Sequence, residues 1–210
     1  MTKWNHDSFF TFSEAYLLGQ ELAEQIGERV IGRIAGYPPD HGVLAQMLHN
    51  AGDGDHLEVG TLFGGSAILA ALIKERYDLD GKVVCVDPMT GYYGKPDPFT
   101  GEMASQRVFY ENVDRFDLSD RIELIVSTSS DLTLSKRRNF ASTFIDGAHD
   151  YNRVLADWNL IKWHTDRYVL FDNYDRAFPG VRAAVRIAIE EPEWRPVLIY
   201  GISALFEREN

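Results

Sequence analysis

The sequence predicts an α/β fold, in which a mostly parallel sheet of seven strands carries helices on both faces. From residue 56 to residue 191, short apolar segments typical of strands alternate with longer segments typical of helices. Such alternation implies parallel pairing through crossover helices. Residues 196–208 break the pattern with two apolar segments around a tight turn, which predicts a C-terminal antiparallel hairpin.

A helical N-terminal extension is expected before the alternating part. Residues 13–34 place apolar and charged side chains at helical spacing, with Ser13 as a candidate N-cap. A Gly-Tyr-Pro-Pro break follows, and a second helix is expected over residues 41–50. We therefore divide the chain into an extension at residues 1–50 and a single globular unit at residues 51–210.

The alternating part supplies the remaining elements in order. The expected strands cover residues 56–59, 82–86, 122–126, 140–145 and 168–171, with hairpin strands at 196–200 and 203–208. The expected helices cover residues 66–76, 102–116, 131–138, 152–163 and 181–191. In open sheets of this class, ligands bind beyond the carboxyl ends of the strands. The residues that follow each strand are therefore the candidates for function.

A glycine-rich turn follows the first strand. The segment from Glu58 to Ser66 carries glycine at positions 60, 64 and 65, where a ligand can approach the backbone closely. It lacks the lysine of a phosphate-binding P-loop and the Gly-x-Gly-x-x-Gly spacing of a dinucleotide site. Asp87 ends the second strand, where an acid can accept hydrogen bonds from ribose hydroxyls. A plain turn is the alternative at both positions.

Hydroxyl side chains follow the third strand, at residues 127–130. They could contact a nucleobase, or Ser130 could cap the next helix. The sequence favours neither interpretation.

Acidic and amide side chains follow the fourth and fifth strands. Adjacent strand ends would bring Asp146 close to Asp172 and Asn173. Carboxylate and amide oxygens are ligands that Mg²⁺ and Ca²⁺ prefer, although the same residues could simply cap helices and line a wet cleft. His149 is a candidate general base because histidine titrates near neutral pH. Its alternative role is to orient a loop.

Two of these segments resemble one known family. The segment from Glu58 to Ser66 is similar to motif I of class I S-adenosylmethionine-dependent methyltransferases, in the Glu-x-Gly-x-x-x-Gly-x-Ser form of catechol-type O-methyltransferases. The segment from Asp146 to Asp157 resembles the Asp-Gly-x-His-x-Tyr-x-x-Val-x-x-Asp pattern of a bacterial group related to macrocin-type O-methyltransferases. The resemblance covers roughly residues 36–208 and implies a Rossmann-like fold.

The resemblance also implies a role for each matching residue. The residues expected to surround S-adenosylmethionine are Glu58, Gly60, Thr61, Gly64, Ser66, Asp87 and Ser129. The residues expected to hold a divalent metal such as Mg²⁺ are Asp146, Asp172 and Asn173. Together these roles predict a methyltransferase that acts on a hydroxyl group of a small molecule, with Asp146 and His149 as catalytic residues. Whether the metal is required stays open.

Two departures from the family pattern leave the base in question. Macrocin-type enzymes carry an acid where this chain has Ala148, and catechol-type enzymes carry a lysine near this segment that is absent here. His149 is then the default base. Ala148 also favours an alternative function, a non-catalytic S-adenosylmethionine-binding or scaffold protein of the same fold.

A Gly/Pro-rich loop follows Asp87 at residues 89–101. Loops of this kind often cover a site, and we expect Tyr92, Tyr93 and Phe99 to pack on the acceptor. A structural surface loop is the alternative. The N-terminal extension could likewise cover the acceptor cleft or pair with another subunit. The sequence therefore does not decide whether the protein is a homo-oligomer.

Composition limits the partners. A net charge of −11 opposes binding to the phosphates of nucleic acid. The apolar runs are too short for a membrane span, and the N-terminus lacks a signal-peptide pattern. A single cysteine, Cys85, excludes a disulfide within the chain and suits a buried strand position. These features predict a cytoplasmic protein.

Overall fold

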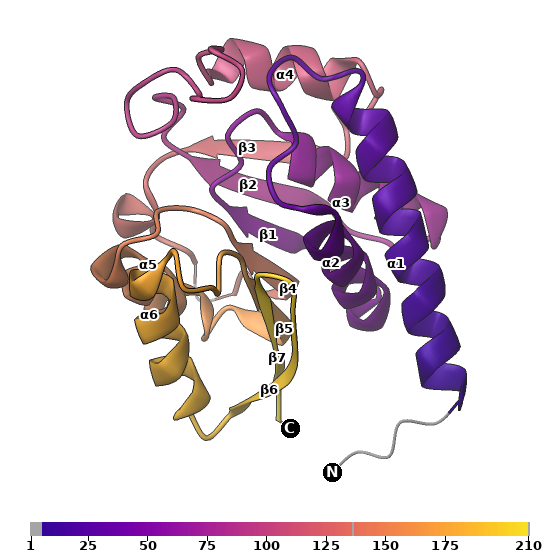
Figure 1. Cartoon of the computed structure of the whole chain (residues 1–210), viewed down its shortest axis with the longest axis vertical. Helices are drawn as coiled ribbons and strands as arrows, with labels where there is room; N and C mark the ends of the chain where they lie inside the picture. The colour runs from indigo at the N-terminus through magenta and orange to yellow at the C-terminus, as the bar shows by residue number, and fades with distance from the viewer. Residues whose placement is uncertain (1–5, 136, 210) are drawn as a thin grey trace.

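The computed structural model describes residues 6–135 and 137–209, with side chains from residue 14 onward. Its seven-stranded sheet has the order β3-β2-β1-β4-β5-β7-β6 (Figure 1). The pairs formed by β1 to β5 are parallel, whereas β7 runs antiparallel to both β5 and β6. The predicted fold class is confirmed, including the C-terminal hairpin.

The strands are β1 (His56–Val59), β2 (Val83–Asp87), β3 (Ile122–Val126), β4 (Phe140–Ile145), β5 (Thr165–Phe171), β6 (Trp194–Tyr200) and β7 (Ser203–Arg208). The helices are α1 (His6–Gly27), α2 (Pro38–Ala51), α3 (Gly65–Arg76), α4 (Gln106–Asp114), α5 (Tyr151–Ile161) and α6 (Pro179–Ile189), with a 3₁₀ turn, η1, at Ser129–Asp131. Among the helices in these described ranges, none is long and apolar enough to cross a membrane.

Two hydrophobic clusters hold the helices to the two faces of the sheet. Alternate residues of a strand point to opposite faces, so Cys85 joins the cluster under α1, α2 and α3, whereas Val84 joins the cluster under α5 and α6. Trp158 of α5 is fully buried in the second cluster, with its ring 5.4 Å from that of Trp194. Figure 1 shows the two helical layers on either side of the strands.

The N-terminal extension differs from its prediction. Helix α1 begins at His6, so Ser13 lies inside the helix and is not its N-cap. The helix ends at Gly27, and residues 28–37 form an irregular crossing segment where a helix was expected to continue. Gly32 adopts a φ of +85° in this segment, a conformation that a helix excludes.

Helix α2 begins earlier than predicted because proline suits the first turn of a helix, where its missing N–H is not needed. Pro38 opens the helix, and the Asp40 side chain accepts a hydrogen bond from the backbone N–H of Tyr37 at 3.0 Å. The Pro-Pro pair therefore starts the helix instead of separating it from the extension.

The helix predicted at residues 131–138 does not form in the described part of that stretch, which lacks only Lys136. The chain makes the short turn η1 instead, and Thr128, not Ser130, is its N-cap. Leu132 and Leu134 alternate, and both pack against the cluster under α5 and α6. Alternation of this kind suits an extended segment better than a helix.

Candidate active site

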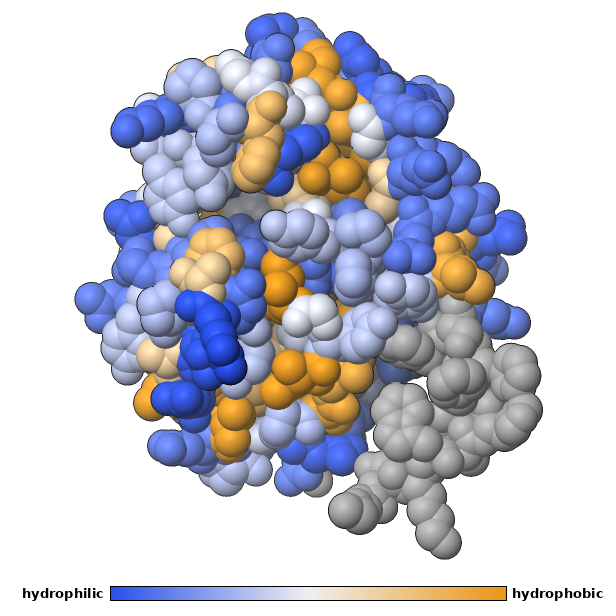
Figure 2. All heavy atoms as spheres, in the orientation of Figure 1, coloured by the Kyte–Doolittle hydropathy of each residue, from blue (hydrophilic) through white to orange (hydrophobic). Residues whose placement is uncertain are grey.

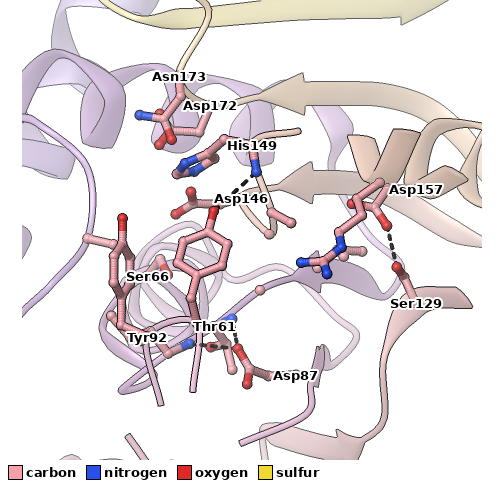
Figure 3. Close-up of a pocket in the computed structure, with 18 of the residues that line it drawn as sticks. Thr61, Ser66, Asp87, Tyr92, Ser129, Asp146, His149, Asp157, Asp172 and Asn173 are labelled. Carbon is pink, nitrogen blue, oxygen red and sulfur yellow. Dashed lines mark hydrogen bonds between the residues drawn. The ribbon is translucent and has the colours of Figure 1, made fainter. Parts of the chain in front are cut away.

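A cavity of about 1170 Å³ opens beyond the carboxyl ends of β1, β2, β4 and β5. The predicted site residues that line it are Gly60, Thr61, Ser66, Asp87, Ser129, Asp146, His149, Asp172 and Asn173 (Figure 3). Glu58 and Gly64 are not among the lining residues. Figure 2 shows hydrophobic side chains gathered across the face in view, between hydrophilic flanks.

The glycine-rich loop (residues 60–66) depends on glycine for its path. Gly60 has a φ of +84°, and a Cβ atom there would lie 2.3 Å from the backbone oxygen of Asp146. The turn after β1 is therefore in direct backbone contact with the turn after β4. Gly64 also has a φ of +84° and is the N-cap of α3, whose first N–H groups have no partner within the helix.

Glu58 of β1 supports this loop through a hydrogen bond with Ser66. Its side chain is fully buried in β1, and Oε1 accepts a hydrogen bond from the Ser66 hydroxyl at 2.7 Å. Burial raises the pKa of Glu58 to about 7, although the hydrogen bond from Ser66 opposes the rise. Glu58 therefore positions Ser66 and does not itself line the cavity.

Glu58→Gln should flatten the pH dependence of stability. Because the pKa of Glu58 rises from 4.5 to about 7 on folding, the folded state holds the proton more tightly. Stability from this group is therefore present below pH 4.5 and is lost as pH rises through 7. Glutamine keeps an oxygen for Ser66 and does not ionise, so the variant should be more stable than the natural chain at pH 8 by about 1–3 kcal/mol.

Urea unfolding at pH 5 and pH 8 measures this effect. The exposed Glu102→Gln variant provides the control and should follow the natural chain at both pH values. Parallel pH profiles for Glu58→Gln and the natural chain would contradict burial of an ionisable Glu58.

Asp87 also holds the glycine-rich loop in place by accepting hydrogen bonds from its backbone. Its position at the end of a strand did not indicate this role. Its Oδ2 atom accepts hydrogen bonds from the backbone N–H groups of Thr61 at 3.0 Å and Leu62 at 3.1 Å, and Oδ1 accepts from Met89 at 2.7 Å. A carboxylate offers about four acceptor sites, so one remains for a ligand hydroxyl.

Ser129 reaches the cavity from η1 and donates a hydrogen bond to Asp157 of α5 (Figure 3). Asp157 is almost fully buried, and burial raises its pKa to about 6 against the effect of this hydrogen bond. Asp157, the last acid of the predicted Asp-Gly-x-His segment, thus holds Ser129 in position at the cavity wall. It lines the cavity, although its position inside a helix gave no sign of this.

Asp146 and Asp172 form a carboxylate pair on the floor of the cavity. The N–H of Asp172 donates to the oxygen of Ile145 at 3.0 Å, which continues the β4–β5 ladder and places Asp146 and Asp172 at neighbouring strand ends. Burial and the charge of Asp172 raise the pKa of Asp146, and burial raises that of Asp172 to about 7. Asn173 follows with a φ of +59° and is nearly buried.

This donor set fits a divalent cation. Oδ1 of Asp172 is buried without a hydrogen-bond partner in the described structure, and a cation would offset the repulsion between the two carboxylates. Within the same described residues no cluster of three His, Cys, Asp or Glu side chains is arranged for a metal, so the third donor here would be the Asn173 amide oxygen.

His149 lines the cavity, and its ring lies between the carboxylates of Asp172 and Asp146 in the view of Figure 3. Its ring centroid lies 4.5 Å from that of Phe178 and 6.2 Å from that of Tyr93. Burial lowers the pKa of His149, which favours the neutral imidazole, the form that can accept a proton. Ala148 also lines the cavity.

The Gly/Pro-rich loop at residues 89–101, which we call the lid loop, contributes to the cavity wall. Its turn is closed by two backbone hydrogen bonds between Tyr92 and Lys95, and Tyr92, Tyr93 and Phe99 all line the cavity. The Tyr93 hydroxyl accepts a hydrogen bond from the backbone N–H of His149 at 3.2 Å. The lid loop is therefore joined to the segment after β4. The crossing segment adds Arg33, Ile34 and Tyr37 to the wall, so this part of the N-terminal extension lies at the cleft, although the sequence singled out none of these three residues.

Tyr93→Phe should loosen this connection without changing the apolar contacts of the ring. Because one neutral hydrogen bond is lost, we expect kcat/KM for the acceptor to fall by roughly two- to tenfold. Cofactor binding should not change. Steady-state kinetics measures the effect, and Tyr92→Phe is the matched control, because the Tyr92 hydroxyl makes no hydrogen bond in the described structure. Equal effects of the two substitutions would contradict a link through Tyr93.

Comparison with known proteins places the chain in a family. The model of a family described as a methyltransferase domain matches residues 57–174, more than half of the chain. Comparison with curated proteins gives no match.

Solved structures of several methyltransferases have the same fold. The O-methyltransferase NovP is 19% identical, with a TM-score of 0.69 over 95% of this chain and 100% of its own. The O-methyltransferase TomG from Streptomyces achromogenes, in complex with SAM, is 14% identical, with a TM-score of 0.63 over 99% of this chain and 92% of its own. An O-methyltransferase from Bacillus cereus, in complex with SAH, is 18% identical, with a TM-score of 0.61 over 91% of this chain and 90% of its own. The chain therefore belongs to the methyltransferase domain family, and its fold is that of class I S-adenosylmethionine-dependent methyltransferases.

Proposed function

We propose that this protein transfers a methyl group from S-adenosylmethionine to a hydroxyl group of a small molecule. One observation carries the proposal: a single cavity joins the glycine-rich loop and Asp87 to the carboxylate pair and His149. At about 1170 Å³ it exceeds the usual range of roughly 300–1,000 Å³ for a single small ligand, so it has room for a cofactor and an acceptor together.

The cofactor half of the cavity follows from the loop geometry. Gly60, Thr61 and Ser66 would surround the methionine part. Gly64, the N-cap of α3, and Glu58, which holds Ser66 in place, would support the loop from outside the cavity. The free acceptor capacity of Asp87 would bind a ribose hydroxyl, and Ser129 would lie beside the adenine. S-adenosylmethionine, when bound, supplies a methyl group on a positively charged sulfur.

The acceptor half must position a hydroxyl group and remove its proton. Asp146 and His149 line this half, under the aromatic side chains of the lid loop. The neutral imidazole of His149 would take the proton, and the aromatic side chains of the lid loop would limit access of water. Holding the acceptor oxygen in line with the methyl group is the main contribution of such a site.

A divalent cation such as Mg²⁺ would bind to Asp146, Asp172 and Asn173. When present it would lower the pKa of an acceptor hydroxyl and orient it. Catechol-type O-methyltransferases, to which the sequence is similar, carry a metal at the matching positions. The donor chemistry of the three side chains and the unpartnered oxygen of Asp172 support the same role here.

A small-molecule acceptor suits the charge of the protein. The cavity lining includes Asp87, Asp146, Asp157, Asp172 and Asp175, which would repel the phosphates of a nucleic acid. The neighbours TomG and NovP are O-methyltransferases, which supports a hydroxyl acceptor. A second candidate function, non-catalytic binding of S-adenosylmethionine, is favoured by Ala148 alone.

Calorimetry and a turnover assay separate these functions. The purified protein is titrated with S-adenosylmethionine, S-adenosylhomocysteine and NAD, and then incubated with S-adenosylmethionine, Mg²⁺ and a panel of catechol and sugar acceptors. We expect both sulfur compounds to bind at micromolar concentration, NAD not to bind, and S-adenosylhomocysteine to form with at least one acceptor. Binding without turnover on any acceptor favours the non-catalytic function, and absence of binding rejects both.

A further inference from the structure

Arg33 presents a fixed guanidinium group to the cavity. Its Nε atom donates to Asp97 at 3.0 Å, and its guanidinium carbon lies 4.9 Å from the ring centre of Phe99. Asp97 is buried, and its other oxygen accepts hydrogen bonds from Phe99 and Thr100. The remaining N–H groups of Arg33 have no partner among the described residues, and its side chain is 25% exposed. Arg33 is therefore oriented by the protein but keeps donors for a ligand.

The crossing segment places Arg33 directly on the glycine-rich loop. Buried Asn112 of α4 clamps the two together, because its amide donates to the backbone oxygens of Ile31 at 3.0 Å and Phe63 at 2.9 Å. A Cβ atom at Gly65 would lie 2.7 Å from the Cα atom of Ile34. The residues on both sides of Arg33 are thus packed against the loop that opens α3, at the methionine end of the proposed cofactor site.

Charge makes Arg33 unusual in this cavity. The lining carries five aspartates, and Arg33 and Arg153 supply its arginine side chains. Arg153 is 66% exposed and pairs with Asp150 at 3.4 Å. Arg33 lines the same cavity as Asp146. Any anion bound among these carboxylates at the loop would need the charge of Arg33.

We infer that Arg33 binds the α-carboxylate of the methionyl part of S-adenosylmethionine, which extends the proposed function to a residue outside the sequence motifs. Guanidinium groups suit carboxylates because their planar donors match the two oxygens. Asp97 and Phe99 would act as positioning residues that hold Arg33 in the orientation for binding. The inference rests on the proposed cofactor, and it joins the lid loop to cofactor binding through Asp97.

Two ligands that differ in this carboxylate test the inference. S-adenosylhomocysteine carries it, whereas 5′-methylthioadenosine has the same adenine and ribose but lacks the amino acid part. We expect Arg33→Gln to weaken S-adenosylhomocysteine binding by about tenfold to hundredfold, the cost of one charged hydrogen-bonded contact, and to change 5′-methylthioadenosine binding by less than about threefold. Arg33→Lys, which keeps the charge, should recover part of the loss.

Arg29→Gln is the matched control, because Arg29 lies in the same crossing segment but packs on Phe116, outside the cavity lining. It should bind both ligands as the natural chain does. Equal weakening of both ligands by Arg33→Gln would overturn the inference in favour of a purely structural role. Unchanged binding of both would also overturn it and would point to an anionic acceptor. If the natural chain bound neither ligand, the proposed function itself would fail.

Discussion

Gly60→Ala should destabilise the protein and nearly abolish cofactor binding. A side chain at Gly60 would require a left-handed φ of +84° and would place Cβ 2.3 Å from the Asp146 oxygen and 2.6 Å from the Gly147 Cα atom. Both atoms belong to backbone that the sheet holds in place, so the loop must move. We expect a loss of roughly 2–5 kcal/mol in the free energy of unfolding. Binding of S-adenosylhomocysteine should weaken by about a hundredfold or more, since the loop forms its proposed site.

Gly101→Ala separates steric displacement from backbone strain. Gly101 has a φ of +75°, but nothing lies within 4 Å of the position of a Cβ atom there. This variant should lose only about 1–2 kcal/mol and should bind S-adenosylhomocysteine normally. Urea unfolding and calorimetry on both variants measure the difference. Normal ligand binding by a folded Gly60→Ala variant would contradict the proposed role of the glycine-rich loop.

The sheet could be predicted because its signals are local. The apolar segments of β1, β3, β4 and β7 are bounded by turn residues, and the predicted bounds agree with the structure. The order of the strand ends then follows from parallel crossovers, which is why Asp146 and Asp172 were expected to meet. Their meeting is a property of the topology and requires no knowledge of side-chain packing.

The crossing segment could not be predicted because its conformation depends on distant residues. A Cβ atom at Gly32 would lie 2.5 Å from the Phe63 ring, and Ile31 pairs with Asn112 of α4. The charged residues nearby still gave a helical spacing, so the sequence favoured a helix through residue 34. Local preference is weak where tertiary contacts decide the backbone.

The same reason explains which site residues were missed. Arg33 and Asp157 line the cavity but do not follow strands directly, and each is held there by a partner far away in the sequence, Asp97 for Arg33 and Ser129 for Asp157. Asp87 was identified by its position, but its three hydrogen bonds to loop N–H groups were not, because they depend on how the loop folds back. A sequence pattern shows which side chains reach a strand end and not what they bind there.

Asp172→Asn should reduce turnover by roughly a hundredfold or more while making the protein more stable. Asp172 is 5% exposed, and burial together with nearby acids raises its pKa to about 7. At pH 8 the ionised Asp172 carboxylate is held away from water, so its replacement by a neutral amide should raise the free energy of unfolding by about 1–3 kcal/mol. Turnover should fall because the acceptor half loses the charge that would hold a cation or orient a hydroxyl group. Stability gained together with activity lost is expected of a functional residue and not of a structural one.

Asp175→Asn is the control for this change, because Asp175 lines the same cavity but uses Oδ1 for the backbone N–H of Ala177 at 2.7 Å. We expect it to keep most of the activity. Turnover in EDTA then separates two explanations for the loss in Asp172→Asn. If EDTA inactivates the natural chain and Mg²⁺ restores it, the carboxylate pair acts through a metal; full activity in EDTA rejects the metal and leaves the carboxylates to act on the acceptor directly. Full activity of Asp172→Asn would exclude both explanations, and it would also exclude a catalytic role for the carboxylate pair at the ends of β4 and β5.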